Sequence, residues 1–82
     1  MIVSALRQAG ASVETMHMVG HGFPDLAAGY HGDNYFIEVK NPRKPKADQQ
    51  LTADQQAWHD QWRGRVAIAY TIEDALRIVG AI

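Results

Sequence analysis

The sequence contains no cysteine among its 82 residues. Disulfide bridges and zinc sites built on thiolates are therefore excluded, and the absence fits a protein of a reducing compartment. Long apolar runs are absent as well: the longest, such as residues 66–70, are far shorter than the roughly 20 residues that cross a bilayer. No signal-peptide pattern is visible at the start of the chain. We therefore expect a cytoplasmic protein without a membrane partner.

The chain has little net charge. Eight Lys and Arg residues and nine Asp and Glu residues leave a formal charge of −1, so the whole molecule has no strong field to attract nucleic acid. One segment without a carboxylate concentrates the positive charge: Lys40, Arg43, Lys44 and Lys46. Such a segment is usually a solvated turn, but beside a phosphodiester site it becomes a candidate clamp for a DNA backbone.

The chain is also short. With 46% hydrophobic and 21% charged residues, it has the composition of one folded domain over residues 1–82. A chain of this size hides only about 60 to 65% of the surface that its unfolded form exposes, and is marginally stable alone. Association with a second copy would bury more surface, so we expect a homodimer.

The hydrophobic pattern predicts alternating helices and strands. Helical spacing at the start ends at Gly10, and Pro42 and Pro45 make the segment 41–50 a loop. Two capping-box patterns, Thr52 with Gln55 and Thr71 with Asp74, each open a helix. The expected elements are a helix at 2–9, strands at 11–18, 26–30 and 35–40, a helix at 52–62, a strand at 66–70 and a helix after residue 71. The order α-β-β-β-α-β-α predicts an α/β protein with a mixed sheet flanked by helices.

Three charged residues are expected to meet on one face of the predicted hairpin. Asp25 begins one arm, while Glu38 and Lys40 alternate onto the same face of the other arm. Two nearby carboxylates repel each other unless a cation lies between them, and a hard ion such as Mg²⁺ or Mn²⁺ prefers oxygen ligands. Such an ion keeps water and takes phosphate oxygens, which suits hydrolysis of a phosphodiester, and Lys40 could hold the water or stabilise the phosphate. The alternative is a turn aspartate and a solvated ion pair.

The spacing of these residues resembles a known nuclease family. Pro24-Asp25 followed by Glu38-Val39-Lys40 is similar to the motif of the PD-(D/E)XK nucleases. The flanking segments at 20–26, 51–55, 58–59 and 71–76 are similar to the VRR-NUC branch, in its short phage or prophage form. The resemblance covers nearly the whole chain and implies a restriction-endonuclease-like fold, whose core has the order of elements predicted above.

The resemblance also implies roles for particular residues. Asp25 and Glu38 correspond to the metal-binding carboxylates, with the Val39 carbonyl as a further ligand, Lys40 to the catalytic lysine and Gln55 to a glutamine near the active site. The family implies a DNA endonuclease dependent on Mg or Mn that acts on branched DNA, as a homodimer similar to junction-resolving enzymes. Its host would be a bacterial or phage-infected cell.

One feature departs from the family. An acidic residue on the first helix usually completes the metal site, and here Met1 stands in its place. We therefore expect weakened metal binding and reduced cleavage, unless an upstream acid or Glu14 compensates. This leaves an alternative function, a catalytically weak or inactive DNA-binding module, and a third, a small scaffold that binds a protein.

Several other residues keep two interpretations. His21 lies in the glycine-rich loop beside Asp25 and is either a phosphate contact or a plain loop histidine. Gln55 serves the active site, or only its capping box. Trp58 and Trp62 are expected to pack on the sheet or in a dimer interface rather than to stack on bases. The histidines lack zinc spacing, and the glycines lack the pattern of a nucleotide-binding loop.

Overall fold

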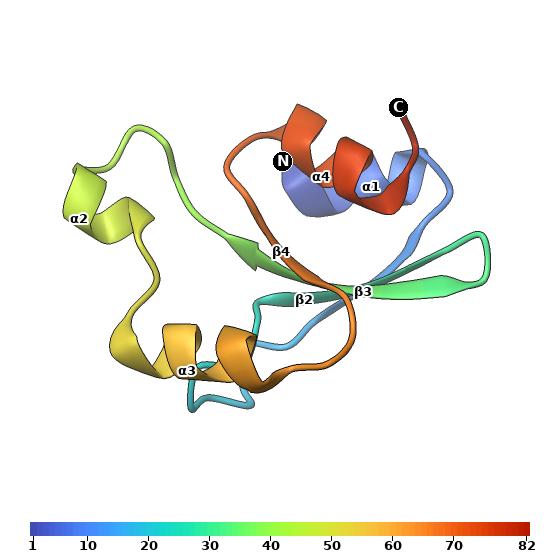
Figure 1. The fold of residues 1–82 in the computed structure, drawn as a ribbon. Coiled ribbons are helices and arrows are strands. Elements are labelled where there is room, and N and C mark those ends of the chain that lie inside the picture. Colours follow the sequence, from blue (N-terminus) through green and yellow to red (C-terminus); the bar gives the residue numbers. More distant parts are fainter.

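The computed structural model describes all residues from 1 to 82, and its sheet lies between two layers of helices (Figure 1). Helices α1 and α4 cover one face of the sheet, and α3 lies on the opposite side. The predicted α/β protein with a mixed sheet flanked by helices is confirmed. The elements in chain order are α1 (Ile2–Gln8), β1 (Ser12–Thr15), β2 (Leu26–Tyr30), β3 (Asp33–Val39), α2 (Lys46–Gln49), α3 (Ala53–Gln61), β4 (Val66–Ala69) and α4 (Ile72–Val79).

The four strands lie side by side in sequence order, β1-β2-β3-β4. The first three strands are antiparallel. Strand β4 runs parallel to β3, and α2 and α3 form the crossover connection that two parallel strands require. The β2–β3 register pairs Leu26 with Ile37. This register determines which side chains share a face at the open end of the hairpin, opposite the turn.

The apolar core lies between the sheet and the pair α1 and α4. Leu6 of α1 and Ile37 of β3 are both fully buried there, and Ala75 and Val79 bring the apolar stripe of α4 against them. Because side chains alternate along a strand, Phe36, Glu38 and Lys40 point to the opposite face of β3. That face is the one on which α3 packs.

The hairpin turn is tighter than the sequence predicts. Only His31 and Gly32 connect the strands, with φ of 50° and 85°, and β3 already begins at Asp33. Two-residue hairpins favour positive φ at both turn positions because that twist matches the twist of the strands. Asp33 is therefore a strand residue, and its carboxylate forms an ion pair with Arg65 at 3.0 Å.

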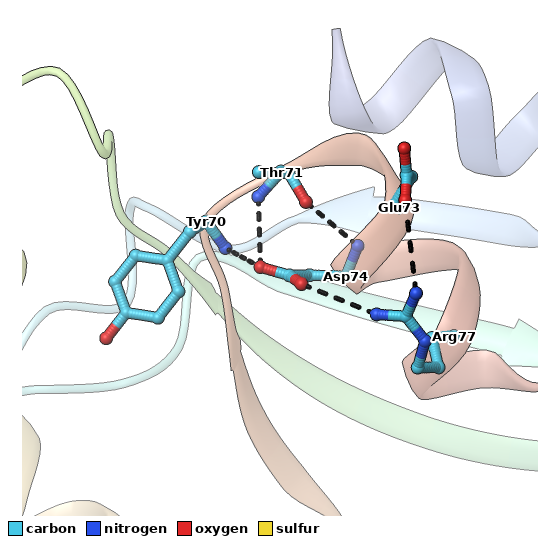
Figure 2. Close-up of polar contacts among 5 residues, drawn as sticks. All are labelled: Tyr70, Thr71, Glu73, Asp74 and Arg77. Atoms are coloured by element: carbon cyan, nitrogen blue, oxygen red, sulfur yellow. Dashed lines mark hydrogen bonds and ion pairs between the residues drawn. The ribbon is translucent and has the colours of Figure 1, made fainter.

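Helix α4 begins where the sequence predicts, directly after Thr71 (Figure 2). The Asp74 backbone N–H donates to Thr71 Oγ1 at 3.1 Å, and the Asp74 carboxylate accepts from the N–H groups of Tyr70 and Thr71 at 2.9 and 3.2 Å. Arg77, one turn later, lies 3.7 Å from Asp74. Gly80 ends the helix in the left-handed conformation, with φ of 81°.

Helix α3 packs on the sheet through aromatic side chains, as the sequence predicts. Trp58 and Trp62 stack with ring centroids 4.7 Å apart, and both meet Phe36 of β3 edge to face. Phe23, from the loop before β2, adds a fourth ring at 5.1 Å from Trp58. The same contacts place the first turn of α3 near the ends of β2 and β3.

Two sequence predictions about loops are wrong in part. The segment 41–50 is not entirely loop, because a single helical turn, α2, follows Pro45; with four residues and no buried side chain, it has no hydrophobic stripe to reveal it. The strand expected over 11–18 ends at Thr15, because residues 16–23 form two successive turns closed by hydrogen bonds of Val19 to Met16 and of Phe23 to Gly20. None of the helices is long and apolar enough to cross a bilayer.

Candidate active site

Asp25 is held at the start of β2 from two sides. Its backbone carbonyl accepts from Met16 N–H at 2.7 Å, and its Oδ2 accepts from Val39 N–H at 2.9 Å. If the register of the hairpin is continued by one residue, Asp25 lies opposite Glu38. Directly opposite residues share a face, with Cβ atoms about 4.5 to 5.5 Å apart. The structure therefore brings the two predicted carboxylates together.

Glu38 is the only charged residue that is buried, with 2% of its surface exposed. Its Oε2 accepts from the Gln55 side-chain amide at 3.3 Å, whereas its Oε1 is buried and has no hydrogen-bond partner. Burial raises the pKa of Glu38 to about 8; the Asp25 carboxylate adds to this shift, and the Lys40 charge opposes it. An ionised Glu38 therefore requires a positive partner that the protein supplies only in part.

Gln55 joins the two ends of the site. Its Nε2 donates to Glu38, and its Oε1 accepts from Lys40 Nζ at 2.8 Å. The same oxygen accepts from Thr52 N–H at 2.9 Å, and the Gln55 N–H donates to Thr52 Oγ1 at 3.2 Å. The two interpretations of Gln55 are thus compatible, since one side chain completes the capping box of α3 and contacts both Glu38 and Lys40.

Val39 lies between these side chains on β3. Its N–H points to Asp25, and in a strand the carbonyl of a residue points to the same side as its N–H. Lys40 N–H points the other way, to the carbonyl of Ala69 at 3.0 Å. The Val39 carbonyl is therefore directed toward the side of the hairpin on which Asp25 lies.

The donor set fits a hard divalent cation and does not fit zinc. It consists of the carboxylates of Asp25 and Glu38 and the carbonyl of Val39, and no group of three or more His, Cys, Asp or Glu residues gathers anywhere in the chain. Mg²⁺ is commonly held by one or two carboxylates together with water and substrate phosphate. The unpartnered, buried Oε1 of Glu38 is the atom that such a cation would satisfy.

The first residue also lies beside the site. Met1 lines a shallow pocket of about 380 Å³ together with Val39 and Lys40, next to the end of β3. The first helix carries no acidic residue, so the structure has no third carboxylate near Asp25 and Glu38. Glu14 is exposed on β1 and lines a different pocket, with Trp62 and Arg65, so it does not compensate.

The predicted DNA contacts lie on two exposed segments. His21 is exposed, with φ of 55°, in the turn that precedes Asp25. The other three predicted contacts lie between β3 and α3, are exposed and form no ion pair: Arg43, Lys44 and Lys46. This segment arches away from the sheet (Figure 1), and Gln49 braces it by donating to the carbonyls of Pro42 and Lys44 at 3.1 and 2.6 Å. The basic side chains are therefore not part of the carboxylate cluster, and Lys46 begins α2.

Two further residues near the site belong to segments that carry the resemblance but were not predicted to be site residues. His59 follows Gln55 by one helical turn, and its Nε2 is buried without a partner. Burial lowers the pKa of His59; the Asp60 charge opposes this shift, and the Lys40 charge adds to it. Gly22 contacts the backbone of α3 at Asp54. The spacing of four between positions 55 and 59 is visible in the sequence, whereas the contact of Gly22 spans distant parts of the chain.

The geometry unites the residues for which the sequence made its strongest prediction. Asp25 is hydrogen-bonded to Val39, and Gln55 is hydrogen-bonded to Glu38 and Lys40. The two sets lie together because Glu38, Val39 and Lys40 are consecutive in the chain. Their roles stay predictions, as does the contact of the exposed basic residues with DNA. Comparison of the chain with protein-family models, with curated proteins and with solved structures finds no match.

Proposed function

We propose that the protein is a DNA endonuclease that depends on Mg or Mn and hydrolyses phosphodiester bonds. The observation that carries this proposal is the buried carboxylate of Glu38. Its Oε1 has no hydrogen-bond partner, and Glu38 lies on the same face of the hairpin as Asp25. Such a pair is costly for a small domain, since an unsatisfied buried polar group costs about 1 to 3 kcal/mol. A cation that both carboxylates bind would offset this cost and supports a functional reason for the arrangement.

Asp25, Glu38 and the Val39 carbonyl would hold the cation. A divalent ion in such a site supplies Lewis acidity and lowers the pKa of a bound water. The protein's contribution is to fix these oxygens before substrate arrives, and both carboxylates are already fixed: Asp25 by Val39 N–H and Glu38 by Gln55. Preorganised groups lose little freedom during the reaction, which favours catalysis.

Lys40 is the remaining charged group of the site. Its ammonium is held 2.8 Å from Gln55 Oε1, and Gln55 in turn contacts Glu38. An ammonium there can orient the attacking water or stabilise the negative charge that develops on the phosphate. Gln55 limits the positions that the flexible lysine side chain can take, so we assign to it the role of holding Lys40 beside the carboxylates.

A polymeric substrate suits the surface around the site. Asp25 and Glu38 line no cavity, and Val39 and Lys40 line only the shallow pocket of about 380 Å³ beside Met1, so the site is open rather than enclosed. The exposed cations of the segment after β3 would contact the phosphate backbone of DNA, and His21 would contact it at the turn before β2. Branched DNA as the preferred substrate, and a homodimer that makes two cuts related by a two-fold axis, follow from the VRR-NUC resemblance and are part of the proposal.

The experiment that tests the proposal is cleavage of labelled branched, nicked and linear DNA with Mg²⁺ or Mn²⁺, read on a denaturing gel. Asp25→Ala, Glu38→Ala and Lys40→Ala should each lower nicking by roughly a hundredfold or more while folding persists, because each removes a group on which the reaction depends. Glu14→Ala is the matched control, since Glu14 is an exposed carboxylate outside the site. The site assignment is wrong if all three variants cut like the parent.

The alternative is a DNA-binding module of the same fold without catalysis. The specific observation in its favour is that only two carboxylates meet at the site. It predicts retention of DNA that weakens with salt and no cleavage with any divalent ion, even in a variant with glutamate at position 1 behind an added initiator methionine. A chain that binds no DNA even at low salt would instead favour the protein-binding scaffold.

A further inference from the structure

Gly22 lies where no side chain fits. Its φ is 81°, and a Cβ built on it would overlap the carbonyl oxygen of Asp54 and lie 2.5 Å from its carbon and 2.9 Å from the N of Gln55. The glycine backbone therefore contacts the peptide bond between Asp54 and Gln55 directly. This peptide belongs to the first turn of α3, 32 residues further along the chain.

The residues that follow Gly22 connect α3 to the strands that carry the carboxylates. Phe23 packs edge to face on Trp58, one turn beyond Gln55, with ring centroids 5.1 Å apart. Pro24 is fully buried, and Asp25 accepts a hydrogen bond from β3 through Val39 N–H. The segment 22–25 thus contacts α3 at its first residues and β3 at its last.

The distance between α3 and β3 matters because Gln55 spans it. Its amide reaches Glu38 at 3.3 Å and Lys40 at 2.8 Å, so a displacement of about 1 Å would break both contacts. An alanine at position 22 would require such a displacement, because the overlapping atoms belong to backbone and cannot rotate away. The residue at position 22 therefore controls how closely Gln55 approaches the site.

We propose that Gly22 is a positioning residue, which sets the distance of Gln55 from Glu38 and Lys40 by allowing the loop and α3 to meet backbone against backbone. The inference deepens the proposed function and rests on it, because Gln55 acts on the reaction only if the site is catalytic. Gly22 itself acts at a distance from the substrate, and its effect passes through Gln55.

Gly20 provides a matched control two residues away. Its φ is 75°, close to that of Gly22, and a Cβ built there meets no atom within 4 Å. Gly20→Ala and Gly22→Ala therefore impose similar strain from a left-handed backbone, but only Gly22→Ala creates the overlap with α3. Any difference in activity between the two variants is therefore due to the contact with α3 and not to the loss of a glycine.

The test is a double-mutant cycle of Gly22→Ala with Gln55→Ala, with nicking of branched DNA in Mn²⁺ as the readout. We expect Gly22→Ala to lower kcat tenfold or more with KM nearly unchanged, and Gly20→Ala to cut like the parent. In the Gln55→Ala background, Gly22→Ala should cost nothing further, because its effect passes through the missing amide. The proposal is overturned if Gly22→Ala cuts as fast as Gly20→Ala, or if its loss adds fully to that of Gln55→Ala.

A second variant is used if Gly22→Ala does not fold. Phe23→Leu weakens the same contact between the loop and α3 without a backbone overlap, and its loss in kcat should likewise vanish in the Gln55→Ala background. A fully additive loss in kcat overturns the inference. If the parent does not cut DNA at all, the proposed function fails, and the NMR signal of the Gln55 side-chain amide decides about Gly22. A signal moved by Gly22→Ala but not by Gly20→Ala supports positioning, and an unmoved signal contradicts it.

Discussion

Glu38 is the residue at which stability and the proposed function oppose each other. The preceding residue of β3, Ile37, buries an ordinary apolar side chain, whereas Glu38 buries a carboxylate with one oxygen unpartnered. An apolar residue of similar size would pack there without the cost of desolvating a charge. Sites that sacrifice stability in this way are commonly functional.

The raised pKa of Glu38 predicts how stability depends on pH. Between the ordinary value of 4.5 and about 8, the folded protein holds a proton that the unfolded chain has lost. The free energy of unfolding should therefore be highest below this range and fall as the pH rises through it. Glu38→Gln, which cannot ionise, should lose this slope and become more stable than the parent above pH 8. Urea unfolding from pH 5 to 9 measures the effect; equal slopes for parent and variant would contradict the buried, perturbed carboxyl.

The capping role of Gln55 and its proposed role in the site can be separated by substitution. Gln55→Glu keeps a residue that suits the capping box, but it cannot donate to Glu38 and adds a negative charge beside it. We expect nearly unchanged helix capping and at least a tenfold loss of nicking. Thr52→Ala should do the opposite, with about 1 kcal/mol of stability lost and most activity kept. Thermal unfolding and the nicking assay check both variants, and a Gln55→Glu protein that cuts normally would remove Gln55 from the site.

At the scale of elements, local patterns were predictable and contacts between distant segments were not. The capping boxes of α3 and α4 depend on residues three apart, so the sequence shows them directly. The shared face of Asp25 and Glu38 follows from alternation in two strands and one turn. The bracing of Gln55 against Lys40, and the contact of Gly22 with Asp54, join segments whose separation only the packed fold determines.

The basic segment between β3 and α3 leads to a prediction about DNA affinity. Its side chains form no ion pair, so their charges are free to neutralise phosphate. Replacing Arg43, Lys44 or Lys46 singly by Gln should weaken binding to DNA of any sequence. It should also make the plot of log affinity against log salt concentration less steep, by about 1 for each phosphate that is no longer neutralised. Filter binding over a range of salt measures this. Arg77→Gln, on α4, is the control, because Arg77 is exposed but its charge is already paired with Glu73 and Asp74. If variants of the segment weaken DNA binding no more than Arg77→Gln does, the segment is only a solvated loop.

At the scale of the whole molecule, the sheet explains how so short a chain has room for the candidate site. The face covered by α1 and α4 holds nearly all of the core, which leaves the opposite face of β2 and β3 free to carry polar groups under α3. Fold class and the carboxylate pair were therefore accessible from the sequence, because both follow from periodicity. The homodimer expected from size and resemblance stays a prediction, since it concerns a second chain.

Under the proposed function, Asp25 and Glu38 bind one divalent ion between them, and titration with Mn²⁺ followed by electron paramagnetic resonance measures that binding. At pH 8 the parent should bind one Mn²⁺ per chain, which Mg²⁺ displaces, and both Asp25→Asn and Glu38→Gln should lose that binding while the Glu14→Ala control keeps it. Equal binding of Mn²⁺ by the parent and both site variants, or no binding by the parent, would show that the two carboxylates do not share an ion.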